Sequence, residues 1–583
     1  MNVLIFLGVA AIAFWLGSRF YSGYIARNLG EDKNVQTPAV KFNDGRDYVP
    51  TKTYVVFAHH FSAIAGAGPI LGPTMAILYG FIPAWLWIVL GGIFIGAVHD
   101  FTSLFVSMRE GGKSMAEVAR KTLGSSGFNL FIGFTIVMIV LVTSSFLSAT
   151  AISLTSLWPL SKIGVTAGKT FLKTVVVDGV LMGRIGGIAS MSVIIITFSS
   201  PFLGWLIYRK GIKTSFAYML AFIICVGSIL LGIAFPVTLA PTQWMIIISI
   251  YVLFAAGVPV WVILQPRDFI NVQILYGGIA LMVASIFSTG LGGLSISVPS
   301  FNLKEGIQHL GLVWPMMFIT IACGAISGFH ALVAGGTTGK QLTNETDARR
   351  VGYNAMLLES IFAVCVLLAL GGAMNFMDYK SVVWPVDPAI KSNPILGFSL
   401  AAGHLMNRGL GIPVALATVF GILLVEGFVI TTLDAAVRLN RYLFEELWVI
   451  LFKKPPALLK NFWVNSGLAV LLMWILAYTN AFNTLWPIFG TANQLLAALT
   501  LLAVSAWLLL RKKKNLFTLI PAVFILVTTL ASLSILLVSY IHKRNYVLIV
   551  ADLLLFLLSA GAIWLVLKTF LRRGARAQAV AMR

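Results

Sequence analysis

The chain has 583 residues, of which 59% are hydrophobic and only 10% are charged. Soluble domains carry about 25% charged residues, so the composition excludes an ordinary soluble protein and indicates an all-helical protein that crosses the lipid bilayer many times. The net charge of +21 is explained by cytoplasmic loops rich in lysine and arginine, and we infer no nucleic-acid partner.

Taken in chain order, the apolar segments predict about 15 transmembrane helices, because about 20 apolar residues cross a bilayer. The first segment follows no basic region, so we interpret it as a retained helix and not as a removed signal peptide. The predicted spans are residues 2–17, 54–80, 84–106, 127–151, 185–207, 215–235, 243–264, 271–290, 311–334, 354–373, 412–433, 463–480, 485–509, 517–540 and 546–567.

The loops between these spans differ in positive charge. Of the 41 lysine and arginine residues, 31 fall in alternate loops on the side that includes the C-terminus, and 10 fall on the other side. Cytoplasmic loops carry the excess of positive charge. We therefore predict that the N-terminus lies outside and the C-terminus inside.

The segment His59–Pro73 lies within the second predicted span and contains three glycines and two prolines. A continuous helix is unfavourable there, and broken backbone inside a membrane must be buried in protein or line a wet cavity. Transporters bind substrate and ion at such breaks. Pro69 suits the first turn of a new half-helix, whose free amides would attract a carboxylate. The predicted substrate-binding backbone is Ala65, Gly66, Ala67, Gly68 and Pro69.

A second segment resembles the first, since Phe61–Gly68 aligns with Phe329–Gly336 in a span that runs in the opposite direction. Two broken helices of opposite direction indicate an inverted repeat, here a LeuT-like core of five plus five helices. We expect the second break at Gly335 and Gly336, with Ala334 and Thr337 completing the substrate site. The predicted organisation is an accessory helix and cytoplasmic segment (1–53), repeat 1 (54–235), two accessory helices (236–310), repeat 2 (311–509), and two further helices with a basic tail (510–583).

His60 and His330 lie beside the two predicted breaks and are expected to line the site. Ionisable groups at membrane depth are usually functional, and histidine changes charge near neutral pH, which favours proton coupling. Two alternatives stay open for these histidines. They can be satisfied by packing and hydrogen bonds, or a metal site can form from His59, His60, His99 and Asp100, although their spacing matches no firm metal motif.

The predicted span 412–433 carries or adjoins four candidates for the ion path: Glu426, Thr431, Thr432 and Asp434. The paired hydroxyls resemble a sodium site, whereas either carboxyl could carry a proton. The alternatives are an internally hydrogen-bonded Glu426 and an end-of-helix Asp434 facing Arg438 one turn later.

Other polar residues within spans have simpler interpretations. Asn493, Gln494 and Glu359 are expected to form hydrogen bonds between helices. No lysine or arginine falls in the middle of a predicted span, so an anionic substrate would be held by half-helix ends, hydroxyls and histidines. Residues 335–341 and 111–114 fail as phosphate loops, so we infer no ATPase site or subunit, and energy must come from a gradient.

The chain resembles the carbon starvation protein (CstA) family in four stretches. They are Asp44–Thr51 running into His59–Pro73, Ala325–Leu332, Asn344–Arg349 with Gly352 and Tyr353, and Trp486–Leu495. The resemblance implies a multi-pass protein of the bacterial inner membrane, in the amino acid-polyamine-cation superfamily. It implies uptake of peptides during carbon starvation or proton-linked uptake of pyruvate.

We therefore predict a secondary transporter, and not an enzyme, that imports a small carboxylate-bearing nutrient by alternating access and needs no cofactor. The expected coupling ion is the proton, with sodium as the alternative. Two other functions stay open, namely a membrane metalloprotein and a nutrient sensor that binds without transporting.

Overall fold

The protein is all-helical apart from one small sheet, as the composition predicts. The computed structural model describes residues 1–44, 48–163, 170–259, 262–387, 390–452 and 454–581, with side chains up to residue 568. Within these ranges, 12 helices are long and apolar enough to cross a membrane, or 13 spans when one bent pair is included. Gly45, Arg46 and Asp47, which belong to the first CstA-like stretch, lie outside the described part of the chain.

The long helices are mostly those predicted from the apolar segments. They are α1 (Val3–Leu16) continued by α2 (Ser22–Leu29), α6 (Phe81–Gly91) continued by α7 (Ala97–Arg109), α9 (Ser125–Ser153), α10 (Ile185–Tyr208), α11 (Thr214–Ala234), α13 (Leu264–Leu291), α17 (Asn354–Ala373), α20 (Val414–Phe452), α21 (Phe462–Thr479), α22 (Phe482–Leu510), α23 (Leu516–His542) and α24 (Tyr546–Ala581). Short π-helical turns join α1 to α2 (Gly17–Tyr21) and α6 to α7 (Gly92–Gly96), and a third precedes α17 (Arg349–Tyr353).

Shorter elements fill the connections and the breaks. The helices are α3 (Pro38–Lys41), α4 (Thr53–Ile64), α5 (Gly68–Ala76), α8 (Met115–Leu123), α12 (Pro241–Gly257), α14 (Leu303–Leu310), α15 (Phe318–Thr320), α16 (Phe329–Gly336), α18 (Phe376–Val383) and α19 (Pro394–Leu410). Strands β1 (Trp158–Pro159), β2 (Thr174–Val177) and β3 (Val180–Gly183) form an antiparallel sheet in the order β1-β3-β2.

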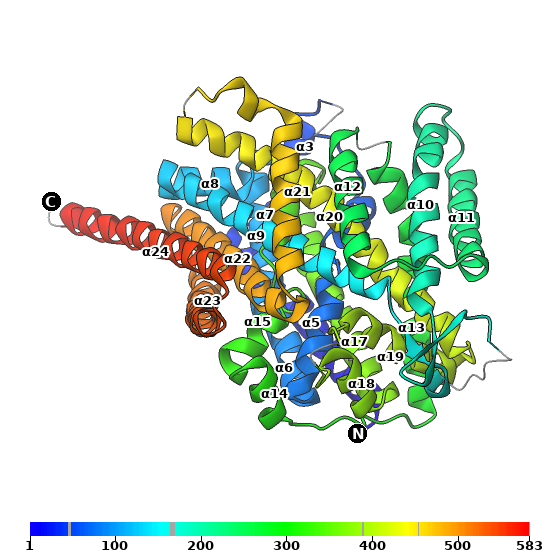
Figure 1. Cartoon of the computed structure of the whole chain (residues 1–583). Helices are drawn as coiled ribbons and strands as arrows, with labels where there is room; N and C mark the ends of the chain where they lie inside the picture. The colour runs from blue at the N-terminus through cyan, green and yellow to red at the C-terminus, as the bar shows by residue number, and fades with distance from the viewer. Residues whose placement is uncertain (45–47, 164–169, 260–261, 388–389, 453, 582–583) are drawn as a thin grey trace.

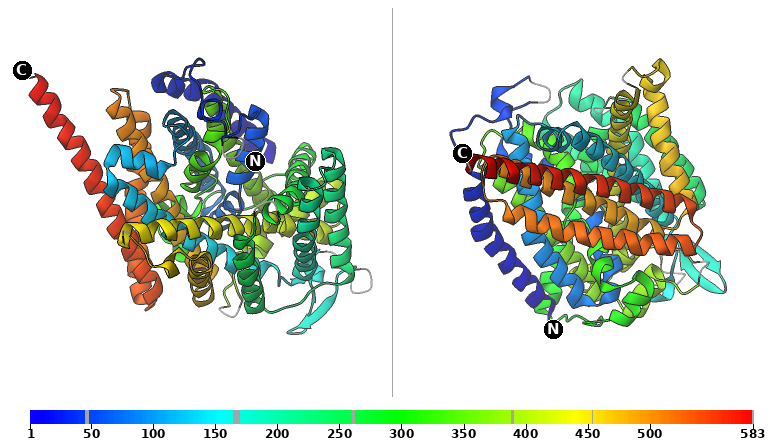
Figure 2. Two further views of the ribbon diagram at one scale, coloured as in Figure 1. Left: turned by 90° about the horizontal axis from the view of Figure 1, so that it is seen from above. Right: turned by 90° about the vertical axis from the view of Figure 1, so that its left-hand side faces the viewer.

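The most enclosed helices surround the two breaks. The apolar windows of α17 and α22 are 89% buried, whereas those of α11 and α24 are 28% buried and therefore face lipid. Figure 1 shows α10 and α11 together at one edge of the molecule. Figure 2 shows α24 along another edge, with its C-terminal part extending beyond the other helices.

The connections gather at two opposite ends of the molecule. At one end, the segment before α4 pairs with the segment after α16 through a parallel bridge between Thr51 and Leu342. At the other end, an antiparallel bridge joins Asn2 to Ser295. Figure 1 shows α3 and α8 at the first end and the N-terminus, α14 and α18 at the second. This is the two-sided arrangement that the loop charges require.

Two predicted spans and one predicted loop differ from the structure. The span 412–433 is the first half of the 39-residue helix α20, because Asp434, Asn440 and Arg441, which follow the predicted span, are buried inside the protein. The span 311–334 is broken in the middle, and the 17-residue helix α19 lies in a segment predicted to be loop. Helix α19 packs against α20, α13, α17 and α5, so this connection folds back onto the bundle.

Candidate functional site

The first predicted break is confirmed. Helix α4 ends at Ile64, Ala65 leaves the helical conformation (φ −73°, ψ 61°), and α5 begins at Gly68. The two half-helices are bent by 44° relative to each other. Pro69 occupies the first turn of α5 and has no amide hydrogen, while the Ile70 and Leu71 amides donate to the Ala67 carbonyl. The positive end of α5, with the amides of Ala67 and Gly68, is therefore the part that faces the break.

The second break lies at residues 321–328, between α15 and α16, and not at Gly335 and Gly336 as predicted. Those glycines are the last two residues of α16. A Cβ at Gly335 would meet the backbone of Ser114 at 3.0 Å, so this glycine permits close packing between segments. The sequence similarity therefore aligns the end of α4 and the first break with α16, which follows the second break instead of leading into it.

The two breaks touch each other. A Cβ added at Gly68 would overlap the side chain of Cys323, and one added at Gly72 would meet the Thr320 carbonyl at 3.0 Å. Glycine is required at both positions because the two backbones approach each other so closely. The irregular segments thus form one continuous centre within the bundle.

Four side chains satisfy carbonyl groups in and beside the second break. Trp87 Nε1 donates to the Ile321 carbonyl at 3.1 Å, and Ser360 Oγ donates to that of Gly324 at 3.0 Å. The other two donors come from α22: Trp486 Nε1 donates to the Thr320 carbonyl at 3.0 Å, and Gln494 Nε2 donates to the Phe318 carbonyl at 2.7 Å. This satisfies the requirement that broken backbone at membrane depth find partners within the protein.

Asn493 holds the beginning of α16. Its Oδ1 accepts a hydrogen bond from the Phe329 amide at 3.1 Å, and its backbone carbonyl accepts one from the Gly328 amide at 3.2 Å. Its Nδ2 donates to Ser327 Oγ at 3.1 Å. The predicted interhelical hydrogen bonding of Asn493 and Gln494 is confirmed.

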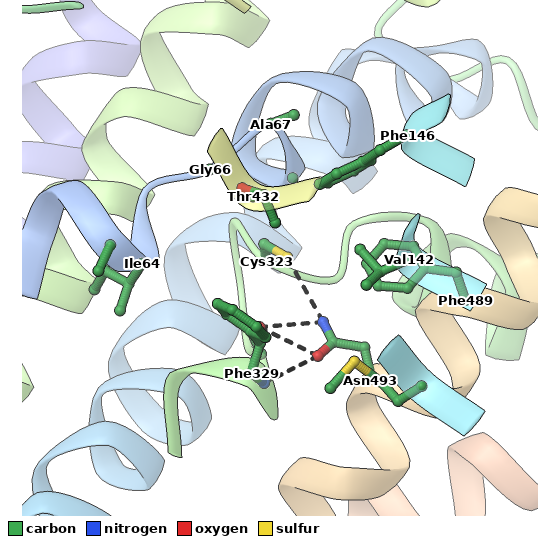
Figure 3. Close-up of a pocket in the computed structure, with 14 residues that line it drawn as sticks. Ile64, Gly66, Ala67, Val142, Phe146, Cys323, Phe329, Thr432, Phe489 and Asn493 are labelled. Atoms are coloured by element: carbon green, nitrogen blue, oxygen red, sulfur yellow. Dashed lines mark hydrogen bonds between the residues drawn. The ribbon is translucent and has the colours of Figure 1, made fainter. Parts of the chain in front are cut away.

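A small cavity of about 30 Å³ lies between the two breaks. Figure 3 shows the Asn493 amide between Cys323 and Phe329, with Gly66, Ala67 and Thr432 across the cavity. The lining residues are Ala63, Ile64, Gly66, Ala67, Gly68, Met138, Val142, Phe146, Cys323, Ser327, Phe329, Thr432, Phe489 and Asn493. These side chains are neutral, and most are apolar.

The predicted site residues separate into two groups. Gly66, Ala67, Gly68 and Thr432 line the cavity. Ala65, Pro69, His60 and His330 lie in or beside the breaks but do not line the cavity. Ala334, Gly335, Gly336 and Thr337 lie at the opposite end of α16 from the second break. Sequence reasoning missed the contributions of α9, since Met138, Val142 and Phe146 lie in an unbroken apolar run with no distinguishing pattern.

A chain of buried ionisable groups lies behind the second break. Asp100 on α7 bonds through Oδ2 to His330 Nδ1 and through Oδ1 to His99 Nδ1, both at 2.7 Å. His330 Nε2 lies 3.4 Å from Glu359 Oε2 on α17. The side chains of these four residues are at most 1% exposed. His60 lies next to them and is hydrogen-bonded to Thr338 Oγ1 at 2.8 Å.

A second buried cluster joins α12, α13 and α20. Asp434 Oδ2 accepts hydrogen bonds from Arg267 Nη1 at 3.0 Å and from the Tyr251 hydroxyl at 2.6 Å. Asp434 therefore lies in mid-helix and is paired with Arg267, which corrects the expected end-of-helix charge facing Arg438. Arg438 instead donates to the backbone carbonyls of Ala255 and Val258. Arg267 was missed because it was assigned to a loop.

The remaining ion-path candidates have individual partners. The Thr431 hydroxyl donates to Asp268 Oδ1 at 2.8 Å, and the Thr432 hydroxyl donates to the Phe428 carbonyl at 2.9 Å. Glu426 accepts a hydrogen bond from Ser153 Oγ on α9, which matches the alternative interpretation of an internally bonded carboxyl.

The residues considered for a metal site do not come together as ligands. His59 is exposed on α4, whereas His60 is buried and bonded to Thr338. In the described part of the chain, no group of three or more His, Cys, Asp or Glu side chains is arranged to hold a metal ion.

The family model for "Carbon starvation protein CstA" matches residues 2–387 and 373–532. The chain belongs to the carbon starvation protein CstA family. It is 31% identical to the peptide transporter CstA of Campylobacter jejuni, over 90% of this chain and 79% of that protein. It is also 31% identical to the pyruvate/proton symporter BtsT of Escherichia coli, over 89% of this chain and 80% of that protein. Among solved structures, a manganese transporter mutant of Eremococcus coleocola aligns with a TM-score of 0.48 at 11% identity, covering 91% of this chain and 98% of that one.

Two of the CstA-like stretches have clear structural roles. Trp486–Leu495 supplies the side chains that satisfy the second break. In Asn344–Arg349, Glu345 forms an ion pair with Arg109, and Asp347 accepts a hydrogen bond from the Thr53 hydroxyl at 2.7 Å. The second stretch therefore anchors the beginning of α4, the half-helix that leads into the cavity.

Proposed function

We propose that this protein is a secondary active transporter that imports a small monocarboxylate of the size of pyruvate together with a proton, by alternating access. The observation that carries the proposal is the cavity between two broken, mutually contacting spans. The names of the relatives, peptide transporter and pyruvate/proton symporter, support transport of a carboxylate-bearing nutrient.

Carboxylate recognition is assigned to the first break. Helix α5 begins at Gly68 beside the cavity, and the amides and positive dipole end of a helix N-terminus favour an anion. Ser327, Thr432 and Asn493 add neutral polar groups to the lining. No lysine or arginine is among the described lining residues, so the positive end of α5, with the amides of Ala67 and Gly68, carries most of the attraction.

The cavity favours pyruvate over a peptide. A peptide carries an ammonium group that needs a carboxylate or several acceptors when it is removed from water, and the described lining contains no Asp or Glu. A cavity of about 30 Å³ holds one or two water molecules, so a substrate enters only when the bundle opens further. A peptide remains the second candidate because five or more relatives carry that name.

The helix packing suggests how the two repeats are composed. Helix α12 packs against α20, α21 and α9, and α13 packs against α20, α19 and α17. Helices α10 and α11 form a pair at the edge of the molecule (Figure 1) that joins the bundle through α13 and α20. Their apolar windows are 33% and 28% buried, whereas that of α13 is 44% buried. We therefore assign α12 and α13, in place of α10 and α11, as the fourth and fifth helices of the first repeat in a LeuT-like core. The pair α10–α11 is then an insertion.

Alternating access requires the broken spans to move relative to the unbroken helices. The broken spans are natural moving parts because each is interrupted at the cavity. Helix α4 is held at its N-terminal end through Thr51, Thr53 and the segment 340–347. At the other end of this broken span, α19 packs against α5. We propose that these two regions control access from opposite sides of the bacterial inner membrane.

The test is uptake by proteoliposomes of labelled pyruvate and of a labelled dipeptide, with proton and sodium gradients imposed separately. Pyruvate is expected to accumulate only with the proton gradient. Accumulation with sodium alone would show that sodium is the coupling ion, with Thr431 and Thr432 near Asp268 as its candidate site. Substrate binding in detergent without uptake under any gradient would indicate a nutrient sensor. Loss of uptake on addition of a metal chelator would favour the membrane metalloprotein.

A further inference from the structure

We propose that Asp100, His330 and Glu359 form the proton-carrying site of the transporter, and that Glu359 is the group that takes up and releases the proton. The inference rests on the proposed proton-coupled transport and names the side chains that perform it. Its basis is a geometry in which two buried carboxyl groups share one imidazole.

The three side chains come from three different elements and are removed from water. Asp100 lies on α7, His330 is the second residue of α16, and Glu359 lies on α17. His330 bonds to Asp100 at 2.7 Å through Nδ1, while its Nε2 is 3.4 Å from Glu359 Oε2. Within the described chain, neither carboxyl oxygen of Glu359 has a hydrogen-bond partner, so the predicted hydrogen bond of Glu359 between helices is wrong.

The charges of this group do not balance unless one carboxyl is protonated. An imidazolium at His330 compensates one carboxylate, and Asp100 has the short hydrogen bonds that stabilise its ionised form. A second carboxylate at Glu359 would be buried without a counter-charge or a donor, which is very unfavourable. In this arrangement Glu359 is therefore the neutral acid.

The position of the site connects it to the movement of the second break. His330 follows the break directly on α16, and Glu359 is adjacent to Ser360, whose hydroxyl binds the Gly324 carbonyl inside the break. Cys323, the residue before Gly324, lines the cavity, so Ser360 and Gly324 connect Glu359 to the cavity wall. A shift of α16 that brings His330 Nε2–H within hydrogen-bond distance of Glu359 allows this carboxyl to ionise.

Substrate binding and protonation then favour each other. A carboxylate in the cavity adds a negative charge near Cys323, which disfavours an ionised Glu359 and favours its protonated form. One anion and one proton enter together, so no net charge crosses the membrane. After α16 shifts, the Glu359 proton passes to water on the side where the substrate leaves.

Further ionisable groups adjoin Asp100, His330 and Glu359 but do not share this arrangement. His60 on α4, His99 on α7 and Cys323 in the second break adjoin members of this group, and His59 adjoins His60. Two other buried carboxyls have fixed partners on different helices, because Asp434 is paired with Arg267 and Glu426 is bonded to Ser153. Glu426 is therefore a matched control for Glu359.

The experiment compares Glu359→Gln, Glu359→Asp and Glu426→Gln in proteoliposomes loaded with pyruvate. A pH difference of about one unit supports about tenfold accumulation when one proton accompanies each anion. We expect Glu359→Gln to lower the accumulation ratio to one while labelled pyruvate still exchanges with unlabelled pyruvate, and this exchange to lose its pH dependence. Glu359→Asp should retain partial accumulation, and Glu426→Gln full accumulation.

The outcomes separate this inference from the proposed function. Full accumulation in Glu359→Gln would overturn the assignment of Glu359, as would loss of accumulation in Glu426→Gln with Glu359→Gln unaffected. If a correctly folded Glu359→Gln protein loses both exchange and accumulation, Glu359 has a structural role and its assignment as the proton carrier is overturned. If the unmodified protein shows no proton-driven accumulation, the proposed function fails whatever the variants do.

Discussion

At the residue scale, the second break depends on single side chains that replace the hydrogen bonds of a continuous helix. Asn493 is the most heavily used of them, since its side chain bonds to the Phe329 amide and to Ser327 Oγ. We expect Asn493→Ala to lower the free energy of unfolding by about 1–3 kcal/mol, because a buried donor and acceptor lose their partner. It should also raise the KM for pyruvate, because residue 493 lines the cavity.

Asn465→Ala is the matched control for this prediction. Asn465 is also fully buried and donates to the carbonyls of Leu459 and Asn461, but it lies on α21 away from the cavity. Thermal unfolding in detergent should show a similar loss of stability for both variants. An equal change of KM in Asn465→Ala would contradict the assigned role of Asn493.

Cys323 offers a direct probe of the cavity. It is partly accessible, whereas Cys225 and Cys365 are buried. We expect a small maleimide to react at Cys323, to block transport, and to react more slowly when pyruvate is present, because thiol and substrate occupy the same space. Cys323→Ser should be resistant. Equal inhibition of Cys323→Ser and the unmodified protein would contradict the position of the cavity.

Individual residues differ in how far their sequence context predicts their role. Asn493 and Gln494 are polar residues within an apolar run, so a role in interhelical hydrogen bonding follows from the cost of leaving them unpaired. The partnership of Arg267 with Asp434 does not follow from sequence. The two residues are separated by 167 positions, and only the packing of α13 on α20 brings them together.

At the scale of elements, two glycines distinguish the observed position of the breaks from the predicted one. A methyl group at Gly68 would overlap Cys323 in the second break, whereas one at Gly336 meets no atom within 4 Å. We expect Gly68→Ala to destabilise the protein by about 1–3 kcal/mol and to abolish transport by separating the two breaks. Gly336→Ala should leave transport unchanged, because alanine suits a helix at least as well as glycine.

Uptake assays and melting temperatures of both variants check this prediction. Normal transport by Gly68→Ala would show that the breaks need not touch. Loss of transport in a stable Gly336→Ala protein would restore the predicted site at Gly335 and Gly336.

Helix lengths illustrate a limit of sequence reasoning. Span prediction ends α20 at residue 433 because Asp434, Arg438 and Arg441 follow, yet all three are accommodated inside the protein or against its carbonyls. Sequence reasoning misses helix α19 for the same reason. Its sequence includes His404, Asn407 and Arg408, so it is too polar for a span, although most of its other residues are buried by α13, α17 and α20.

At the scale of the whole molecule, ion pairs join helices at the end that carries most of the positive charge. Glu110 accepts hydrogen bonds from Lys121 on α8 and from Trp507 and Arg511 beside α22. Partial burial alone would raise the pKa of the Glu110 carboxyl, but these donors and charges outweigh burial and lower the pKa below its ordinary value of 4.5.

This network predicts a pH-dependent contribution to stability. Because the pKa of Glu110 is lower in the folded state, the stabilisation is fully present above the unfolded pKa and disappears as the pH falls through the folded pKa. We expect Glu110→Ala to lose about 1 kcal/mol of stability near pH 7. The difference in melting temperature from the unmodified protein should narrow below pH 4.5. A difference that does not depend on pH would exclude this ion network as its cause.

The orientation of the whole molecule is predicted from charge, since 31 of the 41 lysine and arginine residues belong to the predicted loops of one side. Those loops are held in the cytoplasm during insertion, so that end should face inside. We test this with two exposed positions, Ser126 in the first turn of α9 and Gly179 between β2 and β3, each changed to cysteine in a background without the natural cysteines. A membrane-impermeant maleimide should label position 179 in intact cells and position 126 only in inside-out vesicles. The reverse pattern would invert the predicted orientation. The beginning of α4 and residues 340–347 would then face outward, and the proton and substrate would enter from that end.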